Sequence, residues 1–432
     1  MLTSPLAYFQ QVRDDRQAGV AHATFDPKGP GVGRVFLIPP KPSWRLRESL
    51  LVINGQWTLT VNPSWSRLLR IFFEVLNEKG APEMDEGLWR SIVLITALRM
   101  QSFYPSILLE RFKAELNEVV SIILAVARGQ EVPEGVFQGK TLAEYAPNLR
   151  APLRMDLLVS PMTEGGRRDC PLKCRVCYAE EQPLMMVSDP LSEDDWWHII
   201  NICRSVGIPE LTFTGGEPLT RPDIVRLVNH ARWHLTRLNT SGVLLTETMA
   251  RDLYEANLDA IQITLYSADS PVHNQLVGRH GAWELTVAGV GHAVAAGLNV
   301  SVNTPLVRGN RAYASALRFV HSLGVRYVSC SGLIPTGAAP GQVEKGEALT
   351  QVELFNVLSQ AVVVSRELGM ELNFTSPGAL TDEQLGQLGL QRPICGSCLE
   401  NMAITPAGLV VPCQSSLGES DILGDILKDP WR

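Results

Sequence analysis

The sequence lacks an excess of basic residues. Lysine and arginine together number 38 against 45 aspartate and glutamate residues, which gives a formal net charge of -7 and a pI near 5.7. This balance argues against a protein built mainly to neutralise nucleic-acid phosphates. Small molecules or peptides are the expected partners, and no nucleic acid is expected among them.

Long apolar runs are also absent. The two longest, at residues 91–97 and 119–127, are about half the ~20 residues that span a bilayer. The start, MLTSPLAYFQQVRDDRQ, lacks the basic end and apolar run of a secretory signal. We therefore expect a soluble cytoplasmic protein that does not bind membranes and whose cysteines stay reduced.

Cysteine is scarce, yet it is concentrated. Only 8 of the 432 residues are cysteines, and three of these, Cys170, Cys174 and Cys177, form a C-x3-C-x2-C pattern. Buried thiols do not require such crowding, and a cytosolic disulfide is disfavoured. Zinc in a structural site prefers four protein ligands, and no histidine lies between Cys170 and Trp197. Three thiolates suit a [4Fe-4S] cluster that leaves one iron open to an outside ligand.

The length of the chain and its proline- and glycine-rich interruptions predict several domains. No internal repeat is visible. Residues 1–45 are expected to form an irregular arm. Residues 46–147 predict a small α/β domain, with a hairpin at Asn54-Gly55 followed by helices over 64–77 and 86–128. Residues 148–346 alternate β-rich and helical segments, and residues 347–432 predict a further domain.

Six β-rich runs predict the main fold. They lie at residues 155–160, 210–214, 234–240, 259–265, 298–304 and 326–332. Regular β/α alternation indicates parallel strands, in either a partial β/α barrel or an open doubly wound sheet. Both place ligands at the carboxyl ends of the strands. The cysteine loop, the GGEP segment at 215–218 and several polar clusters follow these strands directly.

The motif Cys170, Cys174, Cys177 and Tyr178, followed by Gly215-Gly216-Glu217-Pro218 after the second strand, resembles the radical S-adenosylmethionine (radical SAM) superfamily. The resemblance implies a partial (β/α)6 barrel with a small N-terminal α/β domain and a C-terminal auxiliary-cluster domain. It implies that the three cysteines hold a [4Fe-4S] cluster and that Glu217, with Gly215 and Gly216, meets the methionyl amine. Glycine at these positions would let the backbone approach the ligand closely.

The same resemblance suggests further contacts to S-adenosylmethionine. Tyr178 would approach the adenine. The ribose and carboxylate would be lined by Asn239, Ser241, Ser267, Asn303 and Arg308. A capped strand end or an exposed polar residue explains any of these five equally well.

A second cysteine group lies near the end of the sequence. Cys395 and Cys398, then Gly408 and Cys413, resemble the start of the auxiliary-cluster domains called SPASM and twitch. This implies a second Fe-S cluster over residues 347–432, and a structural zinc is the alternative. Further cysteines of a full SPASM domain are missing, so either the C-terminus is trimmed or another ligand completes the site.

The chemistry implied is reductive cleavage of S-adenosylmethionine to a 5′-deoxyadenosyl radical that takes hydrogen from a substrate. The electron donor would be a protein such as flavodoxin or ferredoxin. Our preferred substrate is a ribosomally made peptide, because residues 46–147 faintly resemble peptide-recognition domains; a domain that only packs on the barrel fits equally well. The alternatives are dehydrogenation of a small alcohol or amino-sugar, and a metal-stabilised peptide-binding protein without turnover. No catalytic acid or base is identified.

Overall fold

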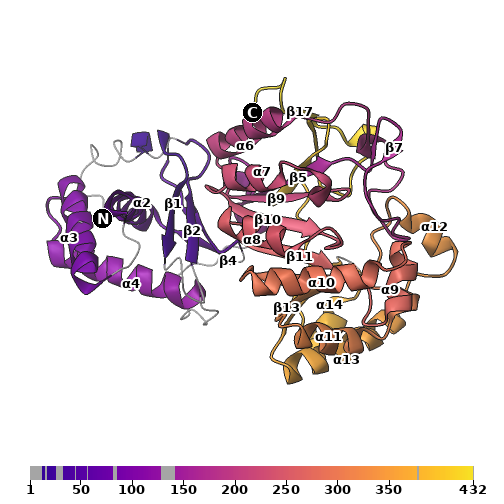
Figure 1. Ribbon diagram of the computed structural model, residues 1–432. Coiled ribbons are helices and arrows are strands. Elements are labelled where there is room, and N and C mark those ends of the chain that lie inside the picture. Colours follow the sequence, from indigo (N-terminus) through magenta and orange to yellow (C-terminus); the bar gives the residue numbers. More distant parts are fainter. Residues whose placement is uncertain are drawn as a thin grey trace. The chain divides into compact units, whose positions relative to one another are not determined.

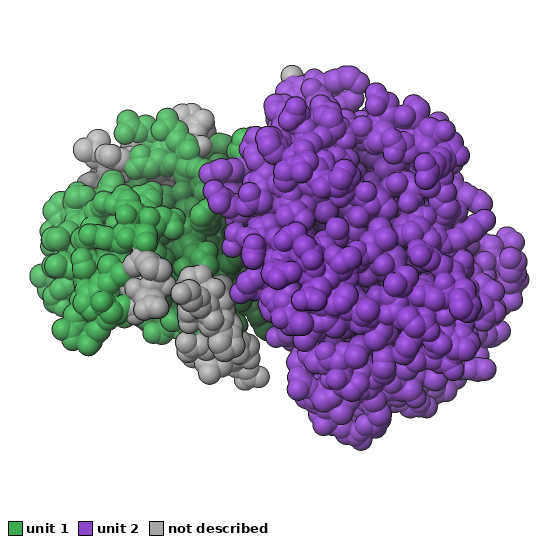
Figure 2. Space-filling view, in the orientation of Figure 1, with its two compact units in different colours: residues 1–151, 205–209 green, residues 152–204, 210–432 purple. Residues whose placement is uncertain are grey.

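The computed structural model describes residues 12–14, 17–25, 33–43, 45–55, 57–80, 85–127, 142–376 and 379–431. The chain divides into two compact units (Figure 2). The first comprises residues 1–151 and 205–209, and the second comprises residues 152–204 and 210–432. None of the helices in the described stretches is long and apolar enough to cross a bilayer.

The first unit contains an antiparallel sheet and three long helices. Its strands follow chain order, β1 (Ala21–Phe25), β2 (Gly33–Ile38), β3 (Ser49–Ile53) and β4 (Trp57–Val61). Asn54 and Gly55 both have positive φ, 54° and 66°, in the turn between β3 and β4, as the Asn-Gly signal predicts. The helices are α2 (Pro63–Lys79), α3 (Glu86–Phe103) and α4 (Leu109–Ala127), followed by the short α5 (Leu142–Tyr145) and η1 (Ala146–Asn148).

Local sequence sets the ends of α2. The Asn62 side chain accepts a hydrogen bond from the Trp65 amide (2.9 Å), and Pro63 occupies the first turn, where its missing N–H is no loss. Gly80 ends the helix in the left-handed conformation. Between these ends, Phe72 and Phe73 are fully buried in the core of the unit.

Two expectations for this unit are wrong. The stretch 1–45, expected to be an irregular arm, contains β1 and β2, which pair with each other and with β3. Glycine and proline around the GRVFLI run hid the strand, and residues 26–32 of this stretch lie outside the described residues. The helical pattern from Glu86 is two helices, because the chain turns at Tyr104-Pro105 and proline cannot continue a helix interior.

The second unit is built on a ten-stranded sheet (Figure 1). The six predicted runs form adjacent parallel strands in the order β5 (Arg154–Ser160), β9 (Glu210–Gly215), β10 (Leu235–Thr240), β11 (Ala260–Thr264), β12 (Val300–Pro305) and β13 (Tyr327–Ser331). The sequence expectation of parallel β/α units is thus confirmed, and their carboxyl ends meet at one edge.

Helices connect these strands. They are α6 (Glu193–Val206), α7 (Ile224–His230), α8 (Glu247–Glu255), α9 (Ser270–Val277), α10 (Ala282–Ala295), α11 (Tyr313–Ser322), α12 (Ala339–Glu344), α13 (Gln351–Glu367) and α14 (Asp382–Leu388). Helices α7, α8 and α10 are neighbours, and α11 packs on α13. Thr350 and Glu353 cap α13 reciprocally, as their spacing predicts.

Residues 347–432 do not stand apart as a separate unit. β14 (Glu371–Phe374) adds to the sheet beside β13, and β15 (Asn401–Ile404) adds beside β5, both in parallel. β16 (Leu409–Val411) and β17 (Gly424–Asp425) follow antiparallel. The auxiliary-domain boundary expected at residue 347 therefore falls inside one continuous sheet.

One close backbone approach in this unit can be tested by substitution. A methyl group on Gly289 of α10 would lie 2.4 Å from the carbonyl oxygen of Gly242, whereas one on Gly291 of the same helix would meet nothing within 4 Å. Gly289→Ala is expected to lower the free energy of unfolding by about 1–3 kcal/mol through overpacking. Gly291→Ala is the matched control and should raise it by about 0.5–1 kcal/mol. The free energies of unfolding of both variants are measured with denaturant. Equal changes in the two variants would contradict the close approach of Gly289 to the Gly242 carbonyl.

Candidate active site

Three cysteines share one loop between β5 and α6. The loop is bordered by the small sheet of β6 (Thr163–Glu164), β7 (Arg167–Arg168) and β8 (Met186–Val187), with η2 (Pro183–Met185) before β8. Cys170 is buried, and Cys174 and Cys177 are half-buried and pack against the same apolar cluster. The sequence prediction that these three lie together at the end of the first strand therefore has a structural basis.

The end of helix α9 holds this loop in place. The amides of Lys173 and Arg175 donate to the carbonyl oxygens of Val277 (3.0 Å) and Leu276 (2.9 Å). The last carbonyls of a helix have no partner within it, so the loop satisfies them. Gly278 then adopts φ +67°, and a methyl group added there would lie 2.5 Å from the Lys173 carbonyl oxygen.

Two further contacts close the loop. The Arg168 guanidinium, half-buried, bonds both carboxylate oxygens of Glu180 (2.8 and 2.7 Å) and also donates to the Leu172 carbonyl. On another side, the Ala338 amide donates to the Cys177 carbonyl (2.9 Å). The arginine therefore serves mainly as a clamp on the loop, in contrast to a freely solvated surface cation.

The thiols are in a chemically unusual state. Burial raises the pKa of Cys170 to about 12, and burial together with the neighbouring thiolates raises the pKa of Cys174 well above its ordinary value. The positive charge of Arg168 lowers these pKa values, but burial outweighs it. Bound iron would supply the further positive charge that three thiolates require, because a metal-bound thiol is deprotonated outright. This donor set and its surroundings fit a cluster.

Glu217 lies beside the cysteine loop and is only 1% exposed. One carboxylate oxygen accepts from the Thr240 hydroxyl (2.6 Å) and the Leu219 amide (3.2 Å), and the other accepts from the amide (2.9 Å) and hydroxyl (2.5 Å) of Ser241. These four bonds use all the acceptor positions of a carboxylate. A ligand amine would have to replace one donor, and a rotatable hydroxyl, that of Ser241 or Thr240, can turn away more readily than a backbone amide.

The structure explains why glycine occupies the two positions before Glu217, which the sequence alone did not. A methyl group on Gly215, whose φ is +136°, would lie 2.4 Å from the Ser160 carbonyl oxygen. One on Gly216 would lie 2.4 Å from the Pro161 carbonyl oxygen. The end of β5 thus already requires glycine here, whether or not a ligand also approaches.

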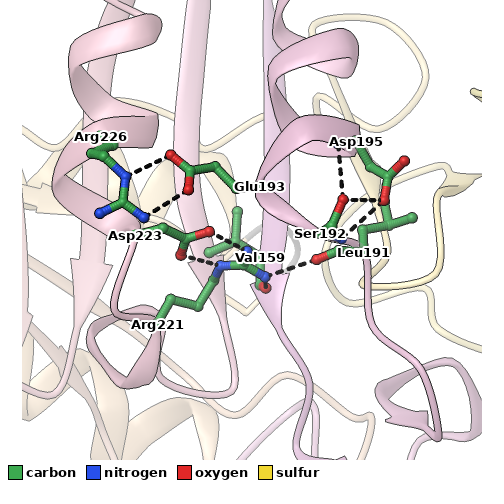
Figure 3. Close-up of polar contacts among 8 residues, drawn as sticks. All are labelled: Val159, Leu191, Ser192, Glu193, Asp195, Arg221, Asp223 and Arg226. Carbon is green, nitrogen blue, oxygen red and sulfur yellow. Dashed lines mark hydrogen bonds and ion pairs between the residues drawn. The ribbon is translucent and has the colours of Figure 1, made fainter.

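Polar contacts tie the turn after Glu217 to its neighbours. The Thr220 hydroxyl, in η3 (Pro218–Thr220), donates to the Asp169 carboxylate (2.8 Å) immediately before Cys170. Arg221 forms a two-bond pair with Asp223 and donates to the carbonyls of Val159 and Leu191, which joins this turn to β5 and to the approach of α6 (Figure 3).

Helix α6 is fastened to the same region. Arg226 makes a two-bond pair with Glu193, both at 2.6 Å, and Asp195 accepts from the amide and hydroxyl of Ser192 (Figure 3). A cavity of about 380 Å³ lies here, lined by both arginines and by residues that include Ser160, Asp169 and Thr220. The first two βα loops are thus fixed to each other by charged and polar contacts.

The remaining predicted ligand residues are placed less uniformly. Asn239 lies half-buried in β10, opposite Gln262. The Ser267 hydroxyl accepts from the Asp269 amide (3.0 Å), and Asn303 accepts from the Ser329 hydroxyl (2.9 Å). Arg308 is exposed and pairs with Glu353 at 3.2 Å. These three side chains make structural contacts within the chain, so any ligand would compete with those contacts.

Tyr178 points in a direction that the sequence did not indicate. Its hydroxyl donates to the Gln414 side chain (3.3 Å). Burial, with the charges of Cys177 and Cys413 among the causes, raises its pKa. The residue after the third cysteine therefore connects the first cysteine loop to the second cysteine group. No sequence signal marked Gln414.

The second cysteine group surrounds the β15–β16 hairpin. The Cys398 amide donates to the carbonyls of Asn401 (3.0 Å) and Pro412 (3.4 Å), so the C-x2-C turn abuts the end of β16, where Cys413 follows. Cys395 and Cys398 are exposed and Cys413 is half-buried. Within the part of the chain that the structure describes, no three His, Cys, Asp or Glu side chains gather tightly enough for a single metal ion.

The close packing of the end of α9 against the cysteine loop can be tested by substituting two glycines, Gly278 and Gly281, that both have positive φ. Gly278→Ala is expected to lower the free energy of unfolding by about 1–2 kcal/mol, because alanine is strained in the left-handed conformation. A further loss is expected because the added methyl would lie 2.5 Å from the Lys173 carbonyl oxygen. Gly281→Ala carries only the strain, since nothing lies within 4 Å of its added methyl. Denaturant unfolding compares the two. Equal losses would mean that α9 does not confine the loop.

Known proteins are similar to the part of the chain that contains this site. Residues 167–312 match the family model described as the Radical SAM superfamily. A PqqA peptide cyclase from Streptomyces rochei is 37% identical over 145 residues, which cover 33% of this chain and 39% of that protein. The chain thus matches about two fifths of that relative's length. A PqqA peptide cyclase from Methylocella silvestris is 25% identical over 281 residues, 62% of this chain and 71% of that protein.

Solved structures show a similar fold. Streptococcus suis SuiB, bound to the precursor peptide SuiA, aligns with a TM-score of 0.58 at 14% identity, over 88% of this chain and 83% of that one. The structure of anSMEcpe with bound AdoMet aligns with a TM-score of 0.50 at 14% identity, over 64% of this chain and 78% of that one. At such identity the likeness concerns the fold. The family match covers the cysteine loop and the Glu217 turn, so the similarity to the radical SAM superfamily lies in residues 167–312 of this chain.

Proposed function

We propose that this chain is a radical SAM enzyme that modifies a peptide. The observation that carries the proposal is the partly buried three-thiol loop, fixed to the Gly215-Gly216-Glu217 turn through Thr220 and Asp169, within the segment that matches the family model. Cys170, Cys174 and Cys177 would hold a [4Fe-4S] cluster. When bound and reduced by one electron, such a cluster would supply the reductive cleavage of S-adenosylmethionine to methionine and a 5′-deoxyadenosyl radical, which would take a hydrogen atom from the substrate.

The chain's own residues would bind and orient the cofactor. Glu217 would receive the methionyl ammonium as the hydroxyl of Ser241 or Thr240 turns away. Tyr178, Asn239, Ser267, Asn303 and Arg308 remain proposed contacts to the rest of the molecule. Of these, Arg308 has the weakest support, because its guanidinium faces Glu353 at the start of α13. The electron would come from a low-potential protein donor such as a flavodoxin or ferredoxin.

We also propose that Cys395, Cys398 and Cys413 hold a second Fe-S cluster. The hydrogen bonds of the Cys398 amide bring the C-x2-C turn against the end of β16. The Tyr178–Gln414 contact then places this group next to the first loop. Such proximity suits an auxiliary cluster that contacts the substrate or accepts its electron.

A peptide is favoured as substrate by the relatives. Two are named PqqA peptide cyclases, and the SuiB structure contains a precursor peptide. In this chain the first unit offers a means of capture, because β4 is the last strand of its sheet and Trp57 on it is 43% exposed. An extended peptide can add to a sheet edge through backbone hydrogen bonds.

The cluster assignment is tested with the full chain reconstituted anaerobically. Cys174→Ala is expected to abolish dithionite-dependent cleavage of S-adenosylmethionine and to lower iron by about four per chain, one cluster's worth. The control is Cys203→Ala, which removes a thiol fully buried in α6 and should preserve both. Iron and sulfide counts together with 5′-deoxyadenosine measured by chromatography decide this. Cleavage that survives Cys174→Ala would refute the assignment.

The proposal that a peptide binds along β4 is tested by selecting, from a display library, peptides that bind the full chain. Trp57→Ala is expected to lower the affinity of the protein for the selected peptides at least fivefold. This corresponds to a loss of about 1 kcal/mol of binding free energy, as for an aromatic residue that anchors an interface. Leu98→Ala is the control, because Leu98 is similarly exposed (50%) but lies on α3. If no peptide is enriched, or both variants bind equally, capture at β4 is wrong.

A further inference from the structure

Two arginines of the ten-stranded sheet have no role in the proposed function. Arg154 is the first residue of β5, and Arg237 lies in β10. Strand β9 runs between these two strands (Figure 1). Asp156 of β5 lies opposite Thr212 of β9, which in turn lies opposite Arg237. Because side chains alternate along a strand, Arg154, Asp156 and Arg237 project from the same face of the sheet.

A buried carboxylate holds each of these arginines. Nε of Arg154 lies 3.0 Å from Oδ1 of Asp156, and Nε of Arg237 lies 2.7 Å from Oε1 of Glu210. The two acidic side chains are almost fully buried, whereas the side chains of Arg154 and Arg237 are 37% and 33% exposed. The carboxylates therefore lie beneath the arginines, and the outer side of this cluster is positive.

The outer nitrogens of both guanidinium groups are available to a ligand. Each ion pair is made at Nε, and among the described residues Nη1 and Nη2 of Arg154 and Arg237 donate no hydrogen bond. A guanidinium presents its donors in a planar fork that matches the two oxygens of a carboxylate. Burial also raises the pKa of Asp156 and of Glu210, which disfavours their charged forms, while arginine stays protonated.

The same face continues as a row of accessible polar side chains. Asn239 lies opposite Gln262, and Gln262 lies opposite Ser301. All three are half-buried, while the residues that alternate with them, such as Ile261 and Val302, are buried. The apolar face of these strands is thus packed into the core, whereas the polar face can contact a ligand.

This polar face extends from the second cysteine group toward the first. Arg154 lies opposite Asn401, and the Asn401 carbonyl accepts from the Cys398 amide (3.0 Å). From Arg154, β5 runs seven residues, about 20 Å, to Ser160, where the chain continues to the first cysteine loop. A substrate lying along this face would have one end at the arginines and the other toward the first cysteine loop.

We propose that Arg154 and Arg237 bind a carboxylate of the peptide substrate and thereby select a substrate that carries one. This inference rests on the proposed function. Asp156 and Glu210 act as positioning residues, because they hold the guanidinium groups at Nε and leave the outer nitrogens for the ligand. The carboxylate belongs either to an acidic side chain of the peptide or to its C-terminus. No covalent step is involved.

The test uses the reconstituted full chain and three small probes. N-acetylglutamate N-methylamide presents a side-chain carboxylate, N-acetylalanine presents a terminal carboxylate, and N-acetylglutamine N-methylamide is the uncharged counterpart of the first. Ligand-observed NMR titrations measure their affinities. One of the two carboxylates should bind at least about tenfold more tightly than the uncharged probe, as charge-assisted paired hydrogen bonds provide. The tighter carboxylate identifies the source.

Two variants locate the binding. Arg237→Gln is expected to lower the affinity for the tighter carboxylate about tenfold, through loss of a charged hydrogen-bond donor. Arg318→Gln is the matched control, because Arg318 also pairs with a carboxylate, that of Glu367 (2.8 Å), but lies on α11. Its affinity should equal that of the wild type. If Arg237→Gln does not fold, the wild type is labelled with phenylglyoxal and mapped by mass spectrometry. The bound probe should then protect Arg154 and Arg237 and leave Arg318 reactive.

The outcomes separate this inference from the proposed function. Equal affinities for the three probes, equal affinities of the two variants, or no protection of Arg154 and Arg237 would overturn the carboxylate site and leave the cluster assignment standing. A wild-type chain that cleaves no S-adenosylmethionine overturns the proposed function. It also removes the assignment of the carboxylate to a substrate, whatever the probes show.

Discussion

The cysteine loop depends on the hydrogen bonds that it makes with the end of α9. A loop that carries three thiols has few backbone partners of its own, and the carbonyls of Leu276 and Val277 have none within their helix. Each group satisfies the other. Because α9 follows β11 in the chain and begins at its Asp269 cap, the sequence connects the cysteine loop to the end of a central strand.

Glu217 has a similar role on the other side of the site. Its buried carboxylate gathers Thr240, Ser241 and the Leu219 amide, which belong to two different βα loops. A buried carboxylate must be fully hydrogen-bonded to be tolerated. The same bonds that stabilise it therefore fix the relative positions of the loops after β9 and β10.

The sequence predicted the central part of this protein well. Strand alternation, the hairpin at Asn54-Gly55 and the cap at Thr350 are local signals, and each appears where it was expected. What failed has two causes, the composition of the first strands and pairing between distant segments. Strands β1 and β2 lie among glycines and prolines, and β14 and β15 are short strands whose partners are far away in the chain.

Side-chain roles were harder to predict than strands. The clustering of Cys170, Cys174 and Cys177 in sequence ensured their proximity, whereas the role of Glu217 was implied by the resemblance of its GGEP segment and stays a prediction. The side chain of Arg308 pairs with Glu353, which no motif indicated. Gly278 and Gln414 belong to the surroundings of the thiols, but they matter through geometry that single-sequence patterns do not record.

The parallel pairing of β15 with β5 also affects how the protein is made. Residues 401–404 lie beside residues 154–157 in the finished sheet, so this neighbour of β5 leaves the ribosome long after the cysteine loop. During synthesis Tyr178 of the cysteine loop lacks its Gln414 partner, and distant pairings of this kind form slowly. The surroundings of the cysteine loop are therefore completed only after the last strands of the sheet have been made.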